Sequence, residues 1–254
     1  RFMRIIESTP WHNLQSRLAE FQRDLESQFG VAVRADTEWL AAIMPAPHVQ
    51  TLHAAVRQAI GLMHQSLRVY ADLHGQFDFA AVRFVRRLVS QMQYRLYPIR
   101  LYVPELTRYW LVDDADVATC EPPPDAVSPA SGIQHYAAEQ HRGAYTSYVP
   151  ESYTADRAWP LLLTLHGGSG NDMDFLWTWL KYAKSRGYIL ISAKSFGSTW
   201  YQWDAPSLLL ILEEMQARYP IDRQRILLAG LSDGGSFGYE VGFAFPEHFA
   251  GLAV

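Results

Sequence analysis

The chain has little cysteine and no long apolar segment. Its 254 residues include one cysteine, Cys120, which excludes a disulfide within the chain and any cluster of thiolates around a metal ion. No apolar run approaches the roughly 18 residues that a membrane-spanning helix needs, so we expect no membrane span. Because reduced cysteine is typical of reducing compartments, we predict a cytoplasmic protein.

The charge is small and unevenly spread. Residues 1–111 carry 13 Arg and 9 acidic residues (+4), and residues 112–254 carry 9 Lys or Arg and 17 acidic residues (−8), which sums to the net charge of −4. The basic half has no basic run interleaved with aromatic residues, so we expect no nucleic-acid partner. A hydrophobic content of 49% is ordinary for a globular protein that buries a core.

The first 112 residues are predicted to form a small helical domain, whose role the sequence does not identify. Thr9 and Pro10 are typical of a helix start, and Gly30 of a helix end. Apolar residues recur at spacings of three and four in three segments, which favours a bundle: Trp11 to Leu25, Val49 to Tyr70, and Val82 to Met92. The five histidines of this region lack the spacing of metal ligands, so we predict no metal site.

Residues 113–132 (DDADVATCEPPPDAVSPASG) are rich in acidic residues and proline and show no hydrophobic periodicity. We interpret them as a linker that holds the domain boundary. After it, apolar strands alternate with helical segments. Strands are expected over 145–149, 160–166, 188–194, 225–231 and 249–254, and helices over 175–185 and 207–218 and from residue 234. This alternation predicts an α/β domain over residues 133–254, with a mostly parallel sheet covered on both faces.

The most informative motif is Gly230-Leu-Ser232-Asp-Gly234, which follows the apolar segment ILLAGL. A serine hydroxyl is a poor nucleophile and must be presented on an exposed, tight turn. The G-x-S-x-G pattern does this where a strand runs directly into a helix, because a Cβ at either glycine would collide within the turn. Gly234, Gly238 and Gly242 then lie on one side of the following helix and allow it to approach the sheet.

The second motif is LLLTLHGGSGND, residues 161–172, in which a buried strand ends at His166-Gly167-Gly168. Both motifs follow the C-terminal ends of predicted parallel strands, where sheets of this kind hold their sites. Together with YTSYVPESY, GSTWYQWD and the segment from Gly230 to Val254, they make residues 133–254 resemble the first two thirds of an α/β-hydrolase domain. Within that superfamily the chain is similar to esterases of the phospholipase/carboxylesterase group and to polyhydroxybutyrate-depolymerase-like proteins.

The resemblance implies Ser232 as the nucleophile and the backbone N–H groups of Gly168 and Asp233 as the oxyanion hole. The Asp233 side chain is expected to point elsewhere, since a carboxylate facing the hole would oppose an oxyanion. In the family, the triad acid and histidine follow a seventh and an eighth strand. We therefore expect both beyond Val254, and the hydrolase domain here to be incomplete, ending in its sixth strand.

Other histidines fit the role of base poorly. His166 lies in the turn after the strand and is expected to brace it, and His248 precedes the last strand, at the far edge of the sheet. Trp200, Tyr201 and Trp203 follow a strand at its C-terminal end and are candidates to line a substrate pocket, or else to pack their own loop.

The sequence thus predicts a serine hydrolase that cleaves small-molecule carboxylic esters through an acyl-serine intermediate, without a metal or an organic cofactor. A serine peptidase of the prolyl-oligopeptidase type is an alternative, since its serine turn also ends in a double glycine like Gly234-Gly235. A non-catalytic hydrolase-like scaffold, with a helical domain that binds a partner, is another. The oligomeric state is not indicated by the sequence.

Overall fold

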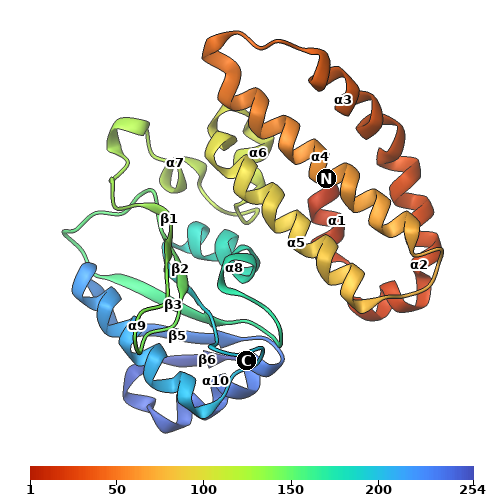
Figure 1. Ribbon diagram of the computed structural model, residues 1–254. Helices are drawn as coiled ribbons and strands as arrows, with labels where there is room; N and C mark the ends of the chain where they lie inside the picture. Colours follow the sequence, from red (N-terminus) through yellow and green to blue (C-terminus); the bar gives the residue numbers. More distant parts are fainter. The chain divides into compact units, whose positions relative to one another are not determined.

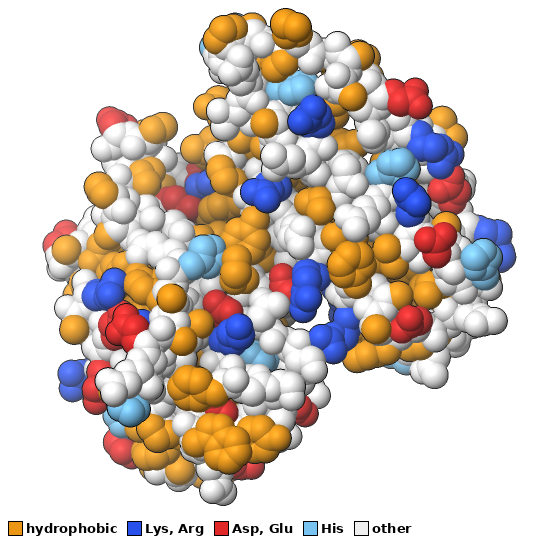
Figure 2. Space-filling view, viewed as in Figure 1, with side chains coloured by type: hydrophobic (Ala, Val, Ile, Leu, Met, Phe, Trp, Pro, Cys, Tyr) orange, Lys and Arg blue, Asp and Glu red, His pale blue; other side chains and the backbone are white.

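The computed structural model describes residues 1–254. The chain divides into two compact units, residues 1–106 and 107–254 (Figure 1). No helix in either unit combines the length and the apolar character needed to cross a lipid bilayer. Figure 2 shows that hydrophobic side chains reach the surface of both units. The large ones include Trp39 and Met44 in the first unit and Trp203 and Phe243 in the second.

The first unit is helical, as its sequence predicts. Its helices are α1 (Phe2–Ser8), α2 (Trp11–Leu25), α3 (Val31–Ala42), α4 (Gln50–Asp72) and α5 (Phe79–Leu96), and α6 (Pro104–Tyr109) spans the division between the units. The two long helices, α4 and α5, pack against each other, and α4 also contacts α2 and α3. The predicted stripe on α5 is its packed face, since Val82, Val85 and Val89 are all buried. Asp78 begins this helix by accepting a hydrogen bond from the Ala80 N–H (2.8 Å).

Two expected helix boundaries were wrong. Thr9 ends α1 instead of beginning α2, because its hydroxyl donates to the Ile5 carbonyl (2.6 Å). Gly30 does not end a helix, because its backbone is right-handed (φ −57°, ψ −49°) and the π-helical turn Glu26–Gly30 continues into α3. A glycine ends a helix when it adopts the left-handed conformation, which Gly30 does not. Neither α1 nor α3 was among the expected helices.

Residues 113–132, interpreted as a linker, belong to the second compact unit, which begins at Thr107. They contain the short helix α7 (Val117–Cys120), and Leu111, Ala115 and Cys120 form a small buried cluster. The buried ammonium of Lys184 lies 3.0 Å from the Glu121 carboxylate. Composition alone did not indicate this packing, because the residues that hold the segment lie far along the chain in α8.

The second unit contains a six-stranded sheet with the order β1-β2-β4-β3-β5-β6. Its strands are β1 (Gly132–Tyr136), β2 (Tyr145–Val149), β3 (Trp159–Leu165), β4 (Ile189–Ala193), β5 (Ile221–Gly230) and β6 (Gly251–Ala253). The pairs β1–β2 and β2–β4 are antiparallel, and β4–β3, β3–β5 and β5–β6 are parallel. The expected strands and the mostly parallel sheet are confirmed, while β1 was not among the expected strands.

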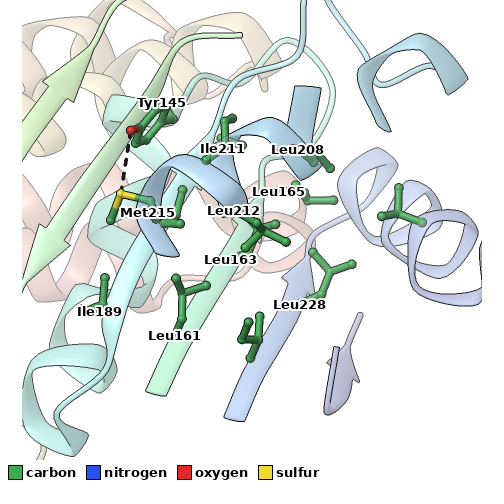
Figure 3. Packing of buried hydrophobic residues seen from close by; sticks show 14 of the residues in the cluster. Tyr145, Leu161, Leu163, Leu165, Ile189, Leu208, Ile211, Leu212, Met215 and Leu228 are labelled. Carbon is green, nitrogen blue, oxygen red and sulfur yellow. Dashed lines mark hydrogen bonds between the residues drawn. The ribbon is translucent and has the colours of Figure 1, made fainter. Parts of the chain in front are cut away.

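Helices cover both faces of this sheet. They are α8 (Asp172–Arg186), α9 (Ala205–Arg218) and α10 (Asp233–Ala244). Alternate residues of β3 (Leu161, Leu163 and Leu165) share one buried cluster with residues of α9 and α10 (Figure 3). On the same face, the Tyr145 hydroxyl donates to the Met215 sulfur (3.7 Å). The helix α8 contacts β2, β3 and β4 but adds no residue to that cluster, so it covers the opposite face. The fold thereby leaves the C-terminal ends of β3, β4 and β5 at one edge.

Candidate active site

Ser232 lies in a tight turn between β5 and α10, with only Leu231 between it and the end of the strand. Its backbone has φ 54° and ψ −121°, a conformation that costs a residue other than glycine on the order of 1–3 kcal/mol. Surrounding hydrogen bonds hold the turn in this shape: the Leu231 N–H donates to the Leu165 carbonyl (3.2 Å), and the Gly234 N–H to the Leu231 carbonyl (3.0 Å). The Ser232 residue is exposed, so the strain presents its hydroxyl at the surface.

The two glycines of the motif are sterically required. A Cβ on Gly230 would overlap the carbonyl of Gly234, and a Cβ on Gly234 would overlap the carbonyls of Leu165 and His166. The first contact is within the turn, and the second is between the turn and the end of β3. The spacing expected from the sequence therefore has a direct geometric cause, and the close approach joins the Ser232 turn to the end of β3.

The turn after β3 is supported by His166, which is buried. Its Nδ1 donates to the Gly167 carbonyl (2.7 Å), and its Nε2 accepts from the Ser195 N–H (3.3 Å). These partners assign the proton of the neutral imidazole to Nδ1. Burial lowers the pKa of His166 below its ordinary value, which keeps the ring neutral. Its carbonyl also accepts from the Trp200 indole N–H (2.7 Å), so His166 connects the turn to the loop after β4.

Gly168 and Asp233, far apart in the sequence, lie side by side. A Cβ on Gly168 would come within 2.6 Å of Asp233 Oδ2, so this carboxylate rests against the Gly168 backbone. The same oxygen accepts a hydrogen bond from the Thr199 hydroxyl (2.6 Å). The backbone N–H groups of Gly168 and Asp233 donate no hydrogen bond within the protein. The two residues expected to supply the oxyanion hole are therefore neighbours, and neither N–H is engaged within the protein. The expectation that the Asp233 side chain points away from Gly168 was wrong, because the Thr199 hydroxyl holds its carboxylate there.

The three aromatic residues proposed from the sequence occupy two environments. Trp200 is buried, and its ring stacks on that of Phe237 at 5.6 Å between ring centres. Tyr201 and Trp203 are exposed and stack on each other at 4.4 Å. The expectation that all three line a pocket therefore fails for Trp200, because its face is covered by the core and its N–H is already bonded. Tyr201 and Trp203 stay candidates for substrate contact.

The loop that carries these rings is organised by Asp204, which sequence reasoning did not single out. Asp204 is buried, and its carboxylate accepts from the N–H groups of Phe196 (2.9 Å) and Tyr201 (2.8 Å). These bonds close the loop upon itself. An aspartate directly before a helix that has proline at its second position is a signal that could have been noticed, although it does not reveal the partner N–H groups.

No histidine within residues 1–254 donates to or accepts from the Ser232 hydroxyl. His135 instead donates through Nδ1 to the Thr146 hydroxyl (2.9 Å), which in turn donates to Asp172 (2.6 Å). His248 lies 3.7 Å from the neighbouring Glu247, in the short turn before β6. No group of three or more His, Cys, Asp or Glu side chains is arranged to hold a metal ion.

Comparisons with known proteins find similar folds among solved structures. No protein-family model matches the chain, and no curated protein does. One similar solved structure is an acetyl xylan esterase from Aspergillus awamori, with 16% identity over 48% of this chain and 50% of that chain and a TM-score of 0.43. Two others come from Staphylococcus aureus. The serine hydrolase FphF has 18% identity over 47% of this chain and 54% of its own, with a TM-score of 0.40. The S-formylglutathione hydrolase FrmB has 18% identity over 50% of this chain and 59% of its own, with a TM-score of 0.41.

The chain spans about half the length of these solved structures. The assignment of the fold rests on the sheet itself, with its antiparallel first strands, parallel centre and β5–Ser232–α10 turn. The second unit has an α/β-hydrolase fold. Within it, the Ser232 turn, the turn after β3 and the loop after β4 meet at the C-terminal edge of the sheet, where such folds place their sites.

Proposed function

We propose that the protein is a serine hydrolase that cleaves carboxylic esters, with Ser232 as its nucleophile. The observation that carries this proposal is the strained, exposed backbone of Ser232 (φ 54°) between two sterically required glycines. A turn with no chemical task gains nothing from holding a serine in this conformation, since glycine would adopt it without strain. Strain of this kind gathers at functional sites, where it presents a reacting group.

In the proposed reaction, Ser232 Oγ attacks the ester carbonyl while a general base takes the hydroxyl proton. The tetrahedral oxyanion accepts hydrogen bonds from the Gly168 and Asp233 N–H groups, which have no partner within the protein. Collapse expels the alcohol, which receives the proton from the base, and leaves an acyl-serine. Water then attacks the acyl-serine through a second oxyanion, which releases the acid and restores the hydroxyl.

The base of the proposed reaction is a histidine oriented by an acid, as the family resemblance implies. His166 does not fit this role, because both of its ring nitrogens are engaged and the ring is buried. No metal ion or organic cofactor enters the proposed reaction. Exposed Tyr201 and Trp203 are proposed to contact the substrate, while Trp200 supports their loop from within the core.

The test is made on the full-length natural protein with short-chain 4-nitrophenyl esters and aminoacyl 4-nitroanilides. We expect turnover of the esters and a loss of at least about 10⁴-fold in kcat for Ser232→Ala. Ser236→Ala is the matched control, since Ser236 is also exposed and lies one turn further along α10, and it should retain activity. A fluorophosphonate should label Ser232 and no other serine.

The outcomes separate the alternatives. Turnover of the nitroanilides alone would replace the esterase proposal with a peptidase of the prolyl-oligopeptidase type. Gly235, the second glycine of the doublet on which that alternative rests, is not sterically required, since a Cβ there would make only ordinary contacts. Failure of the fluorophosphonate to label Ser232 would favour a non-catalytic scaffold.

A further inference from the structure

The Asp233 side chain lies beside the two amides proposed to hold the oxyanion. Its Oδ2 accepts from the Thr199 hydroxyl and rests against the Gly168 backbone, so the carboxylate joins the loop after β4, the turn after β3 and the Ser232 turn. Asp233 is exposed. The hydrogen bond from Thr199 holds the carboxylate beside Gly168, so an acyl group bound at Ser232 would lie near this carboxylate.

No cation lies on the segments that surround this carboxylate. Residues 166–170, 195–204 and 230–236 contain no Lys or Arg, and His166 is held neutral by its burial. Asp233 itself forms no ion pair. The second carboxylate in these segments, that of Asp204, is buried and bound to two backbone N–H groups. Lys194, which is exposed, directly precedes the second segment, and its charge acts on His166. Within the three segments, Asp233 is the one exposed charge.

We infer that Asp233 sets the charge preference of the acyl site, so that esters of uncharged acids are accepted and esters of acids carrying a second carboxylate are disfavoured. The inference rests on the proposed function and names its substrate class. A carbonyl oxygen held by the Asp233 N–H lies within a few ångströms of the carboxylate of the same residue. An acyl carboxylate three or four bonds away would meet that charge at roughly 7 Å, where the repulsion amounts to a rate factor of about 3 in bulk water and more at the lower effective dielectric constant of a protein surface.

The test compares 4-nitrophenyl butyrate with 4-nitrophenyl hemisuccinate, which share a leaving group and differ mainly in the charge of the acyl chain. In the full-length natural protein we expect a higher kcat/KM for the butyrate. Asp233→Asn keeps an oxygen for the Thr199 hydroxyl and removes the charge, and should lower the butyrate-to-hemisuccinate ratio about 3- to 10-fold. Raising the salt concentration should lower the ratio in the wild type and leave it unchanged in Asp233→Asn.

Two further variants separate charge from structure. Glu240→Gln removes a carboxylate from the same side of α10 about 10 Å further along the helix, and should leave the ratio within about twofold. Thr199→Val removes the hydrogen bond and keeps the charge of Asp233, so it should preserve the preference for butyrate even where kcat falls.

Equal loss of both activities in Asp233→Asn, with an unchanged ratio, would overturn the inference and leave Asp233 a positioning residue. If that variant does not fold, the wild type and Thr199→Val still decide, because a ratio independent of salt in both refutes a charge effect. Absence of any Ser232-dependent turnover of either ester would instead reject the proposed function.

Discussion

The ammonium of Lys184 is the most consequential buried charge of the second unit. It lies 2.5 Å from Glu151 and 3.0 Å from Glu121, and the three side chains are 0%, 5% and 4% exposed. The Tyr148 hydroxyl also donates to Glu151 (2.6 Å). The cluster joins α8, the residues after β2 and the segment that the sequence presented as a linker. Breaking this cluster by mutation therefore tests whether residues 113–132 are an integral part of the second unit.

Replacing Lys184 by methionine keeps most of the volume and removes the charge shared by two buried carboxylates. Breaking a buried ion pair from one side costs about 3–5 kcal/mol, because the other charge stays in a poor solvent. For a unit of this size, 1 kcal/mol shifts the melting temperature by about 2–4 °C, so we expect a fall of about 6–20 °C. Native-state hydrogen exchange of the β3 and β5 amides reports this loss for the second unit alone.

The control is Lys181→Met in the same helix. Lys181 is exposed beside the Tyr182 ring and should change stability by less than about 0.5 kcal/mol. The sharper measurement is a double-mutant cycle with Glu121→Gln. Glu121→Gln should destabilise the wild type, because it leaves the Lys184 ammonium without one of its two carboxylates. It should stabilise the Lys184→Met protein, because it removes a buried carboxylate that no longer has the ammonium beside it. A cost below about 1 kcal/mol for Lys184→Met, or the same sign in both backgrounds, would refute the reasoning.

Three further outcomes follow from single sites. Gly234→Ala should abolish the proposed esterase activity and lower stability by at least about 2 kcal/mol, measured by chemical denaturation, because its Cβ would overlap two carbonyls of β3 and the turn after it. Tyr70→Phe in the helical unit should be neutral or slightly stabilising by thermal melting, since the Tyr70 hydroxyl is buried without a hydrogen bond and burial raises its pKa to about 12. Burial lowers the folded-state pKa of His166, so the unfolded chain binds a proton first as the pH falls through about 6.5. The free energy of unfolding should therefore fall as the pH drops from about 6.5 to the lower pKa of folded His166. In His166→Gln, the melting temperature measured between pH 5 and 7 should lack the decrease that His166 causes.

The features that the sequence predicted are those whose causes lie close together in the chain. The apolar run of β3 identifies a strand because it is buried on both faces, and every residue of β3 is buried. The two glycines around Ser232 act on a turn a few residues long, so their spacing carries the geometry. The strand β1 was missed because it is antiparallel at the sheet edge, and its burial is only partial. Its sequence lacks the continuous apolar character that marked β3.

The features that the sequence did not predict depend on partners far along the chain. The motif fixes Asp233 next to Ser232, but the direction of its carboxylate depends on Thr199, which lies on a different loop. Glu121 lies within a proline-rich, acidic stretch that is typical of linkers, and only the position of Lys184 on α8 makes it part of a core. Asp233 and Glu121 would both be expected in solvent from composition alone, but each has a fixed partner in the fold. The charge of Asp233 thereby lies beside the proposed site, and that of Glu121 contributes to stability. The local pattern therefore points to the serine that we propose as the nucleophile, while the charge that we propose to select its substrates becomes visible only once the sheet has brought three separate segments together.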